Sequence, residues 1–221
     1  MFNFVPAIHN RYMEYNEKQI QIMETAEMLF AEKGFNGTSV RDIADKAHVN
    51  LAMISYYFGS KDKLLEALFT YRGEQSKLKL ESMIEDKQLS SMEKMNTLID
   101  HYIDKIMAQP CFSRIMVREQ VLSHTGFTSQ LIFQMKKRNQ ELIAKLIHDG
   151  QKKGEIKKNI DIPLMMATLI GTCNNMVATQ HYYKELNGLQ SMTEEEFQKH
   201  IKKKLSQHLK KLFKAILTNE E

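Results

Sequence analysis

Apolar residues recur along most of this 221-residue chain at spacings of three and four positions, which place side chains on one face of a helix. Only three prolines and nine glycines punctuate the chain, and Ala, Leu, Ile, Met, Glu, Lys and Gln fill its long stretches. This pattern predicts an all-α chain with short turns. The predicted helices cover residues 22–35, 40–47, 51–57, 61–84, 90–109, 111–123, 127–152, 162–186 and 194–218.

The segment from residue 39 to 58 predicts two short helices around a tight turn. Ser39 and Asp42 have the spacing of an N-terminal capping box, and an apolar face with small Ala44 follows. Asn50 is a good cap for the second helix, whose buried side is supplied by Ile54 and Phe58. Two such helices form a helix-turn-helix, whose second helix enters the DNA major groove.

Residues 17–68 resemble the DNA-binding domain of the TetR family of bacterial transcriptional repressors. The run G-F-N-G-T-S-V-R-D-I-A begins at Gly34, and the run Y-Y-F-G-S-K begins at Tyr56, in the order and at the spacing of that family. The resemblance implies a three-helix helix-turn-helix head joined to an α-helical ligand-binding and dimerisation body. It divides the chain into an N-terminal extension (1–16), a DNA-binding domain (17–60) and a body (61–221).

The resemblance also implies which side chains meet double-stranded DNA. His48 stands where the family usually has Gly, at a position that can require positive φ, and His tolerates that better than most residues. Arg41 is the best candidate for reading guanine, and Ser39, Tyr57 and Lys61 are expected to hold phosphates. The full predicted DNA-binding set is Thr38, Ser39, Arg41, Asn50, Leu51, Ala52, Met53, Ser55, Tyr56, Tyr57 and Lys61.

Charge lends this assignment little support. The chain carries a net charge of +4, yet its first 65 residues hold seven Lys or Arg and eight Asp or Glu. Helix N-termini and hydroxyl groups can bind phosphates without a strongly basic surface. The motif, and not the overall charge, therefore carries the prediction of DNA binding.

The last two predicted helices bear on assembly. Residues 162–186 are apolar on several faces, and residues 194–218 follow a Thr193–Glu196 capping box with one apolar and one lysine-rich face. By resemblance they form a homodimer interface, although an intramolecular core helix and a membrane-touching amphipathic helix are the alternatives. The predicted interface residues are Leu169, Val177, Leu205, Leu209, Leu212, Phe213 and Ile216.

An unknown small-molecule effector is expected in the body. Its predicted contacts are Met107, Met116, Met166, Cys173, Asn174 and Met176. Methionines are more often adaptable core filler, and Asn174 and Asn175 in an apolar helix are more often explained by core or interface hydrogen bonds than by ligand contact.

Several other functions have no support in the sequence. The histidines and the two distant cysteines show no ligand spacing, so neither a metal site nor another cofactor is expected. No P-loop, G-x-S-x-G or G-x-G-x-x-G motif occurs, which argues against an enzyme. No segment has the uninterrupted apolar length of a membrane span, and a cytoplasmic location is expected.

The predicted function is a homodimeric repressor that a small-molecule ligand releases from a palindromic operator. An architectural or partner-recruiting DNA-binding protein of the same fold is the alternative. The residues before about Asn16 lack helical periodicity and include a second methionine, Met13, so they are interpreted as a flexible arm or a misassigned start in which residues 1–12 are not part of the native chain.

Overall fold

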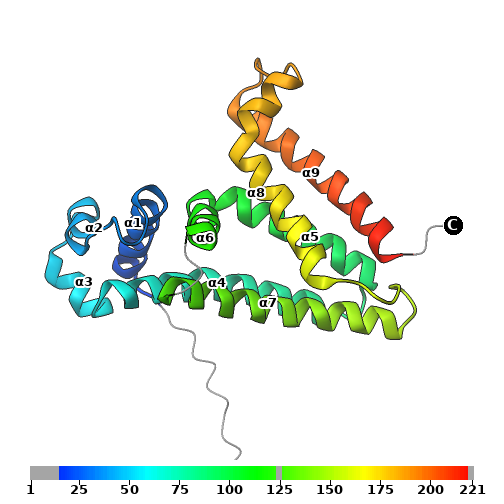
Figure 1. Ribbon diagram of the computed structural model, residues 1–221, viewed down its shortest axis with the longest axis horizontal. Coiled ribbons are helices and arrows are strands. Elements are labelled where there is room, and N and C mark those ends of the chain that lie inside the picture. Colours follow the sequence, from blue (N-terminus) through cyan, green and yellow to red (C-terminus); the bar gives the residue numbers. More distant parts are fainter. Residues whose placement is uncertain (1–14, 123–125, 219–221) are drawn as a thin grey trace, which may run out of the picture. The chain divides into compact units, whose positions relative to one another are not determined.

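The computed structural model describes residues 15–122 and 126–218 (Figure 1). Within those ranges the chain is all-α, with nine helices and no strand. The helices are α1 (Glu17–Lys33), α2 (Val40–Lys46), α3 (Leu51–Phe58), α4 (Lys61–Glu85), α5 (Ser91–Ala108), α6 (Pro110–Leu122), α7 (Phe127–Lys152), α8 (Ile162–Leu186) and α9 (Glu194–Leu217). The predicted arm or misassigned start at residues 1–12 lies outside the described residues.

The chain divides into two compact units, a head (residues 1–65) and a body (residues 66–221). The division falls within α4, directly after Leu65, whereas the sequence placed the boundary ahead of this helix at residue 60. No helix in the described ranges is long and apolar enough to span a membrane.

Capping boxes set the starts of several helices, because a side chain at each cap accepts a bond from an otherwise unpaired backbone N–H. The predicted boxes at α2 and α9 are confirmed, a third starts α5, and a fourth box, which the sequence pattern missed, starts α1. As a result α1 begins at Glu17, five residues before the predicted start, and ends before Gly34, whose φ of 81° closes the helix. The four boxes are Asn16–Gln19, Ser39–Asp42, Ser90–Glu93 and Thr193–Glu196.

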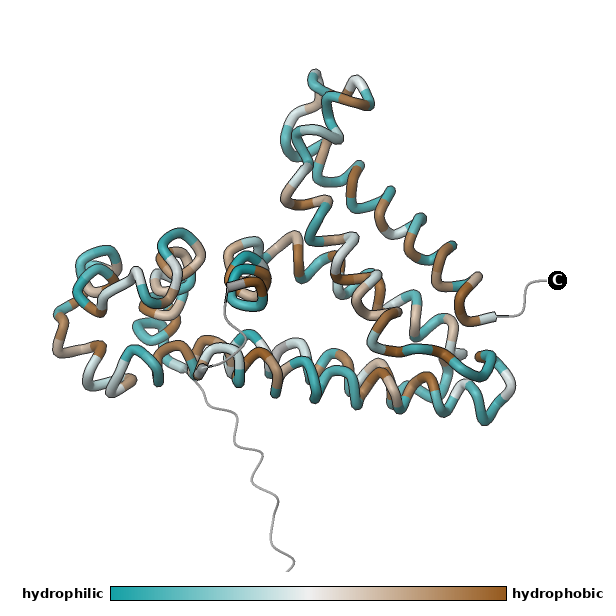
Figure 2. Tube along the Cα trace, viewed as in Figure 1, coloured by the Kyte–Doolittle hydropathy of each residue, from teal (hydrophilic) through white to brown (hydrophobic). Residues whose placement is uncertain are grey.

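The body is built around α5, whose buried side chains include Met95, Leu98, Ile99 and Ile103. Helices α7, α8 and α9 pack against α5. In Figure 1, α8 and α9 form a neighbouring antiparallel pair, and in Figure 2 hydrophobic and hydrophilic stretches alternate along α9. The body part of α4 lies beside α7, where Arg138 Nη1 pairs with Glu74 Oε1 at 2.7 Å.

This core bears on the predicted dimer interface, which stays a prediction. Leu169, Leu205, Leu209 and Phe213 are at most 4% exposed and pack inside the body of one chain. Because their own chain covers these four side chains, the structure favours the intramolecular alternative for them. The other predicted interface residues, Val177, Leu212 and Ile216, are only half-buried.

Candidate functional site

The turn between α2 and α3 is fixed by three local features. Ser39 is the N-cap of α2, and Asp42 completes the capping box by accepting from Ser39 N and Oγ, which lowers the pKa of the Asp42 carboxyl group. His48 has a φ of 52°, as predicted for the position where the family usually has Gly. Asn50 Oδ1 accepts from Ala52 N at 2.9 Å and starts α3. The sequence therefore forms a helix-turn-helix from local interactions.

Thr38 is part of the head's interior, which does not favour a side-chain contact with DNA, and that contact stays a prediction. Its side chain is 1% exposed, and Oγ1 lies 2.9 Å from Gly34 O and 3.2 Å from Leu29 O. The hydroxyl group is thus engaged by backbone carbonyls. Thr38 ties the end of α1 to the start of the helix-turn-helix and has no side-chain surface to offer DNA.

Lys61 also makes contacts within the head. Its ammonium group donates to Phe35 O and Thr38 O, each at 2.9 Å, and lies 4.3 Å from the centre of the Phe35 ring. An ammonium group has three donors, and two are already used here. This geometry favours a structural role for Lys61 over the predicted phosphate contact.

The remaining predicted DNA contacts gather on the outer side of α2 and α3. Ile54 and Phe58 are buried, whereas Ser55 and Tyr56 between them are exposed, Tyr56 at 84%. Met53 and Tyr57 are half-buried, and the Tyr56 and Tyr57 rings meet edge to face at 5.2 Å. The exposed members of the set are Ser39, Arg41, Asn50, Leu51, Ala52, Ser55 and Tyr56. They offer one cation, several hydroxyl groups and apolar surface.

The predicted effector contacts come from α5, α6 and α8. Met166 and Cys173 are buried in the body core, and burial raises the pKa of the Cys173 thiol to about 12. Met107 and Met176 are half-buried against the same core, and Met116 and Asn174 are half-buried as well. This arrangement fits core packing, so contact with an effector stays a prediction.

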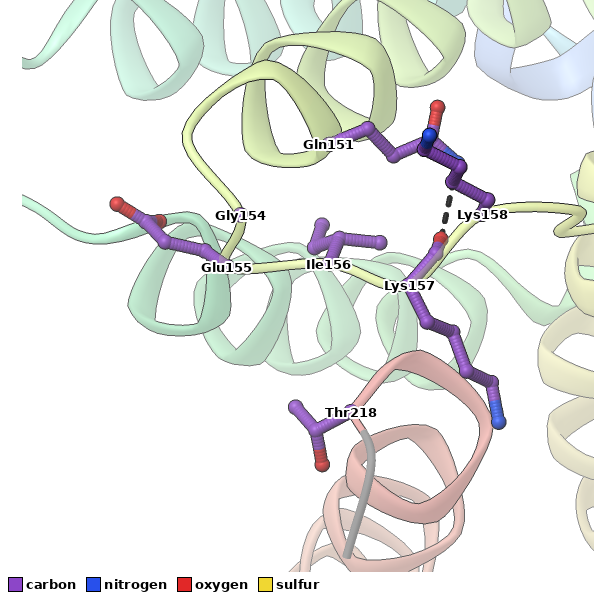
Figure 3. Close-up of a pocket in the computed structure, with 7 residues that line it drawn as sticks. All are labelled: Gln151, Gly154, Glu155, Ile156, Lys157, Lys158 and Thr218. Atoms are coloured by element: carbon purple, nitrogen blue, oxygen red, sulfur yellow. Dashed lines mark hydrogen bonds between the residues drawn. The ribbon is translucent and has the colours of Figure 1, made fainter.

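A hollow in the body lies where α7 ends near the C-terminal end of α9. Figure 3 shows that it is lined by the turn from Gln151 to Lys158 and by Thr218. Gln151 Nε2 donates to Lys157 O at 3.0 Å, and Lys157 N donates to Leu217 O at 2.8 Å. None of the predicted effector contacts lines this hollow. The hydrogen bond from Lys157 N to Leu217 O joins the turn to α9, so these residues have a structural role.

A polar cluster that the sequence pattern did not predict lies where α4, α5 and α7 meet. We call Arg72, Lys105 and Arg138 the cation cluster, because Arg72 and Arg138 both act electrostatically on Lys105. Burial, and then these two arginines, lower the pKa of Lys105 to about 8. Nearby, Ser76 Oγ and His101 Nε2 are 3.1 Å apart.

His101 is electrically neutral near pH 7. Burial, followed by Lys79 and Lys105, lowers its pKa to about 4. Asp104 acts on His101 in the opposite direction and is itself paired with Lys202 at 2.5 Å. The imidazole therefore adds no charge to this part of the body. Among the described residues, no group of three His, Cys, Asp or Glu side chains is arranged to hold a metal ion.

Comparison with protein families finds two matches in succession along the chain. Residues 22–68 match the N-terminal domain described as "Bacterial regulatory proteins, tetR family". Residues 92–207, more than half of the chain, match the domain described as "Tetracyclin repressor-like, C-terminal domain". The first match contains the helix-turn-helix, and the second contains most of the body.

Individual relatives agree with these matches. The probable HTH-type transcriptional regulator YttP of Bacillus subtilis is 32% identical over 137 residues, which are 61% of this chain and 65% of YttP, slightly under two thirds. The fatty acid metabolism regulator protein of Bacillus subtilis is 26% identical over 73% of this chain and 82% of its own. Among solved structures, the regulator FadR from Bacillus subtilis in complex with stearoyl-CoA has a TM-score of 0.63 at 22% identity, over 86% of this chain and 96% of that one.

The last comparison shows the fold alone, because its sequence identity is low. The family matches cover both the head and the body, in the order that the helices follow along the chain. The chain therefore belongs to the TetR family of bacterial transcriptional regulators.

Proposed function

We propose that this regulator is a homodimeric repressor that a small-molecule ligand releases from a palindromic operator. The observation that carries the proposal is the outer side of α2 and α3, where the recognition helix presents exposed side chains over two buried anchors, Ile54 and Phe58. Two such heads related by a two-fold axis fit half-sites about 34–36 Å apart.

Sequence reading would come from Arg41 and from apolar surface. Arg41 is exposed near the start of α2, and a guanidinium group pairs well with guanine. Leu51 and Ala52 are exposed at the start of α3 and suit the methyl groups of thymine, and Ser55 can bond to either base type. We therefore expect an operator half-site with one G·C pair beside a thymine-rich stretch.

The exposed side of α8 supports the homodimer. A stripe at spacings of three and four residues is exposed and uncharged, with small residues in its middle. A Cβ added at Gly171 would meet no atom within 4 Å, so the backbone here is open to close approach by another helix. Half-buried Leu212 and Ile216 on α9 also remain available to a partner. The stripe consists of Leu164, Ala167, Gly171, Asn175 and Ala178, and Tyr182 and Leu186 are exposed beyond a kink of α8 at Thr179.

A charge in this stripe tests the interface. Ala178→Glu should give a folded monomer in sedimentation experiments, because a carboxylate is costly to bury between two apolar helix faces. Lys203→Glu is the matched control, since Lys203 lies exposed on the lysine-rich face of α9. A dimer that persists in Ala178→Glu would place the interface elsewhere.

Ligand release would act through α4, which begins in the head at Lys61 and continues into the body. Because binding equilibria are reciprocal, a ligand that weakens operator binding must itself bind more weakly, by the same factor, to the DNA-bound dimer. FadR from Bacillus subtilis was solved with stearoyl-CoA, which shows that a protein of this fold can bind a small molecule.

Deleting the gene tests the repressor assignment. Transcripts of the regulated genes, sought first among the neighbouring genes, should rise in the deletion strain and fall again when the wild-type chain is restored. Restoring the chain with Arg41→Ala should leave them high, because operator recognition is lost. Transcripts that fall on deletion would make the protein an activator.

A further inference from the structure

Within the cation cluster, Lys105 is the charge without a close partner among the described residues. Arg72, Lys105 and Arg138 come from three different helices, and the carboxylate of Glu74 pairs with Arg138. Glu74 uses Oε1 for Arg138 and Oε2 for Lys77, which lies 3.6 Å away. Across the described residues, no hydrogen bond or ion pair of the Lys105 ammonium group is found. A half-buried cation in this position is costly unless an anion accompanies it.

Neighbouring polar atoms are also unsatisfied. Arg138 Nε, Gln109 Oε1 and Asn139 Oδ1 are buried and have no hydrogen-bond partner among the described residues. Gln109 is the C-cap residue of α5, four residues after Lys105, and Asn139 follows Arg138 on α7, where its side chain also bonds with Tyr102. Buried polar atoms in native proteins are nearly always paired, with protein groups or with water, so Arg138 Nε, in the same cluster as Lys105, is open to a partner that is not part of this chain.

Because Gly73 on α4 has no side chain, the Arg138 guanidinium group can lie close to the helix backbone at this position. A Cβ added at Gly73 would lie 2.9 Å from Arg138 Nη2, closer than atoms pack. The next neighbour, Met135 Sδ, is 3.8 Å away. The guanidinium group is thus held directly against the backbone of α4. This close approach fixes the position of the Arg138 guanidinium group, whose Nε lacks a hydrogen-bond partner among the described residues.

We propose that Lys105 and Arg138, with Arg72 nearby, hold the anionic head group, a carboxylate or phosphate, of the organic effector that regulates this protein. Arginine matches such groups bidentately, and lysine adds a point charge. This inference rests on the proposed release by a small molecule and names the chemical class of that molecule.

Binding to the full-length protein tests the site without DNA. Hexanoate, decanoate and palmitate, together with decyl phosphate, are compared with the straight-chain alcohols of the same lengths by calorimetry. At least one anion should bind about tenfold more tightly than its alcohol. Arg138→Gln should weaken that anion about tenfold, or about 1.4 kcal/mol, and leave the alcohol unchanged.

Matched variants separate recognition from folding. Lys137→Gln changes an exposed cation next to Arg138 on α7 and should bind like the wild type. Lys105→Arg keeps the charge and should retain anion binding, whereas Lys105→Met should lose it. If Arg138→Gln fails to fold, Gly73→Ala serves instead, because the added methyl group displaces the guanidinium group, which lies at the end of a flexible side chain.

Two results would overturn the site: anions that bind no better than their alcohols, or undiminished anion binding in Arg138→Gln and Gly73→Ala. Operator release is measured separately by adding the same compounds to the protein–DNA complex. Anion binding that depends on Arg138 without release would support the site and reject the proposed regulation. Release of the operator by neutral compounds alone would support the proposed regulation and reject the anion site.

Discussion

Replacing Lys105 by Met should stabilise the unliganded protein. Burial, with Arg138 and Arg72, lowers the pKa of Lys105 from 10.5 to about 8. One pKa unit corresponds to about 1.36 kcal/mol, so the charged lysine costs the folded state about 3 kcal/mol near pH 7. Met has a similar length, carries no charge and packs adaptably. Lys105→Met should therefore raise the free energy of unfolding by up to about 3 kcal/mol.

The pH dependence of this gain follows from the direction of the shift. Below pH 8 both the folded and the unfolded wild type carry the charge, so the whole cost is present. As the pH rises from 8 toward 10.5, the folded state loses its proton first and the wild type recovers stability. The difference between Lys105→Met and wild type should accordingly shrink over this interval and vanish above it.

Urea unfolding at fixed protein concentration measures both effects, at pH values near 7 and near 10. Lys145→Met is the control, because Lys145 is exposed on α7 and its replacement should change little. A Lys105→Met variant that is no more stable than wild type near pH 7 would refute the cost of the unpaired cation. A gain that stays constant with pH would assign the effect to packing instead of charge.

Three further predictions concern the head and the core. Arg41→Ala should lose its preference at one G·C position of the operator, worth about 1–3 kcal/mol, in a library selection, and unchanged specificity would mean that Arg41 meets phosphate or solvent. Lys61→Met should lower the stability of the head by about 1–3 kcal/mol, because the carbonyls of Phe35 and Thr38 lose their donor. If stability is unchanged and the slope of log DNA affinity against log salt concentration falls by about one, Lys61 contacts phosphate after all. Leu209→Ala should cost about 2–5 kcal/mol of stability while the folded protein stays dimeric, and dissociation of a still-folded chain would return Leu209 to the interface.

The elements of this fold were predictable because their signals are local. Ser39, Ser90 and Thr193 each stand three residues before an acidic partner, and each starts a helix by a capping box. The left-handed turn at His48 was likewise predicted from its position in the motif. Such signals need no knowledge of the rest of the chain, and so the sequence located both the helix-turn-helix and the body helices.

Features that depend on packing were not predictable in the same way. The apolar face of α9 has the same spacing whether α5 or a second chain covers it, so the sequence could not show that Leu209 is buried within its own chain. Thr38 has the residue type of a DNA contact but faces the interior of the head. The cation cluster draws Arg72, Lys105 and Arg138 from separate helices, so no sequence spacing links them.

The most direct test of the account is a selection of sites from random double-stranded DNA by the full-length protein at a fixed salt concentration. The account predicts an enriched inverted repeat, bound by two chains, with half-sites about 34–36 Å apart. Each half-site should contain one G·C pair that depends on Arg41 and a thymine-rich stretch. Enrichment of a single, unrepeated site by one chain, or no enrichment at all, would contradict it.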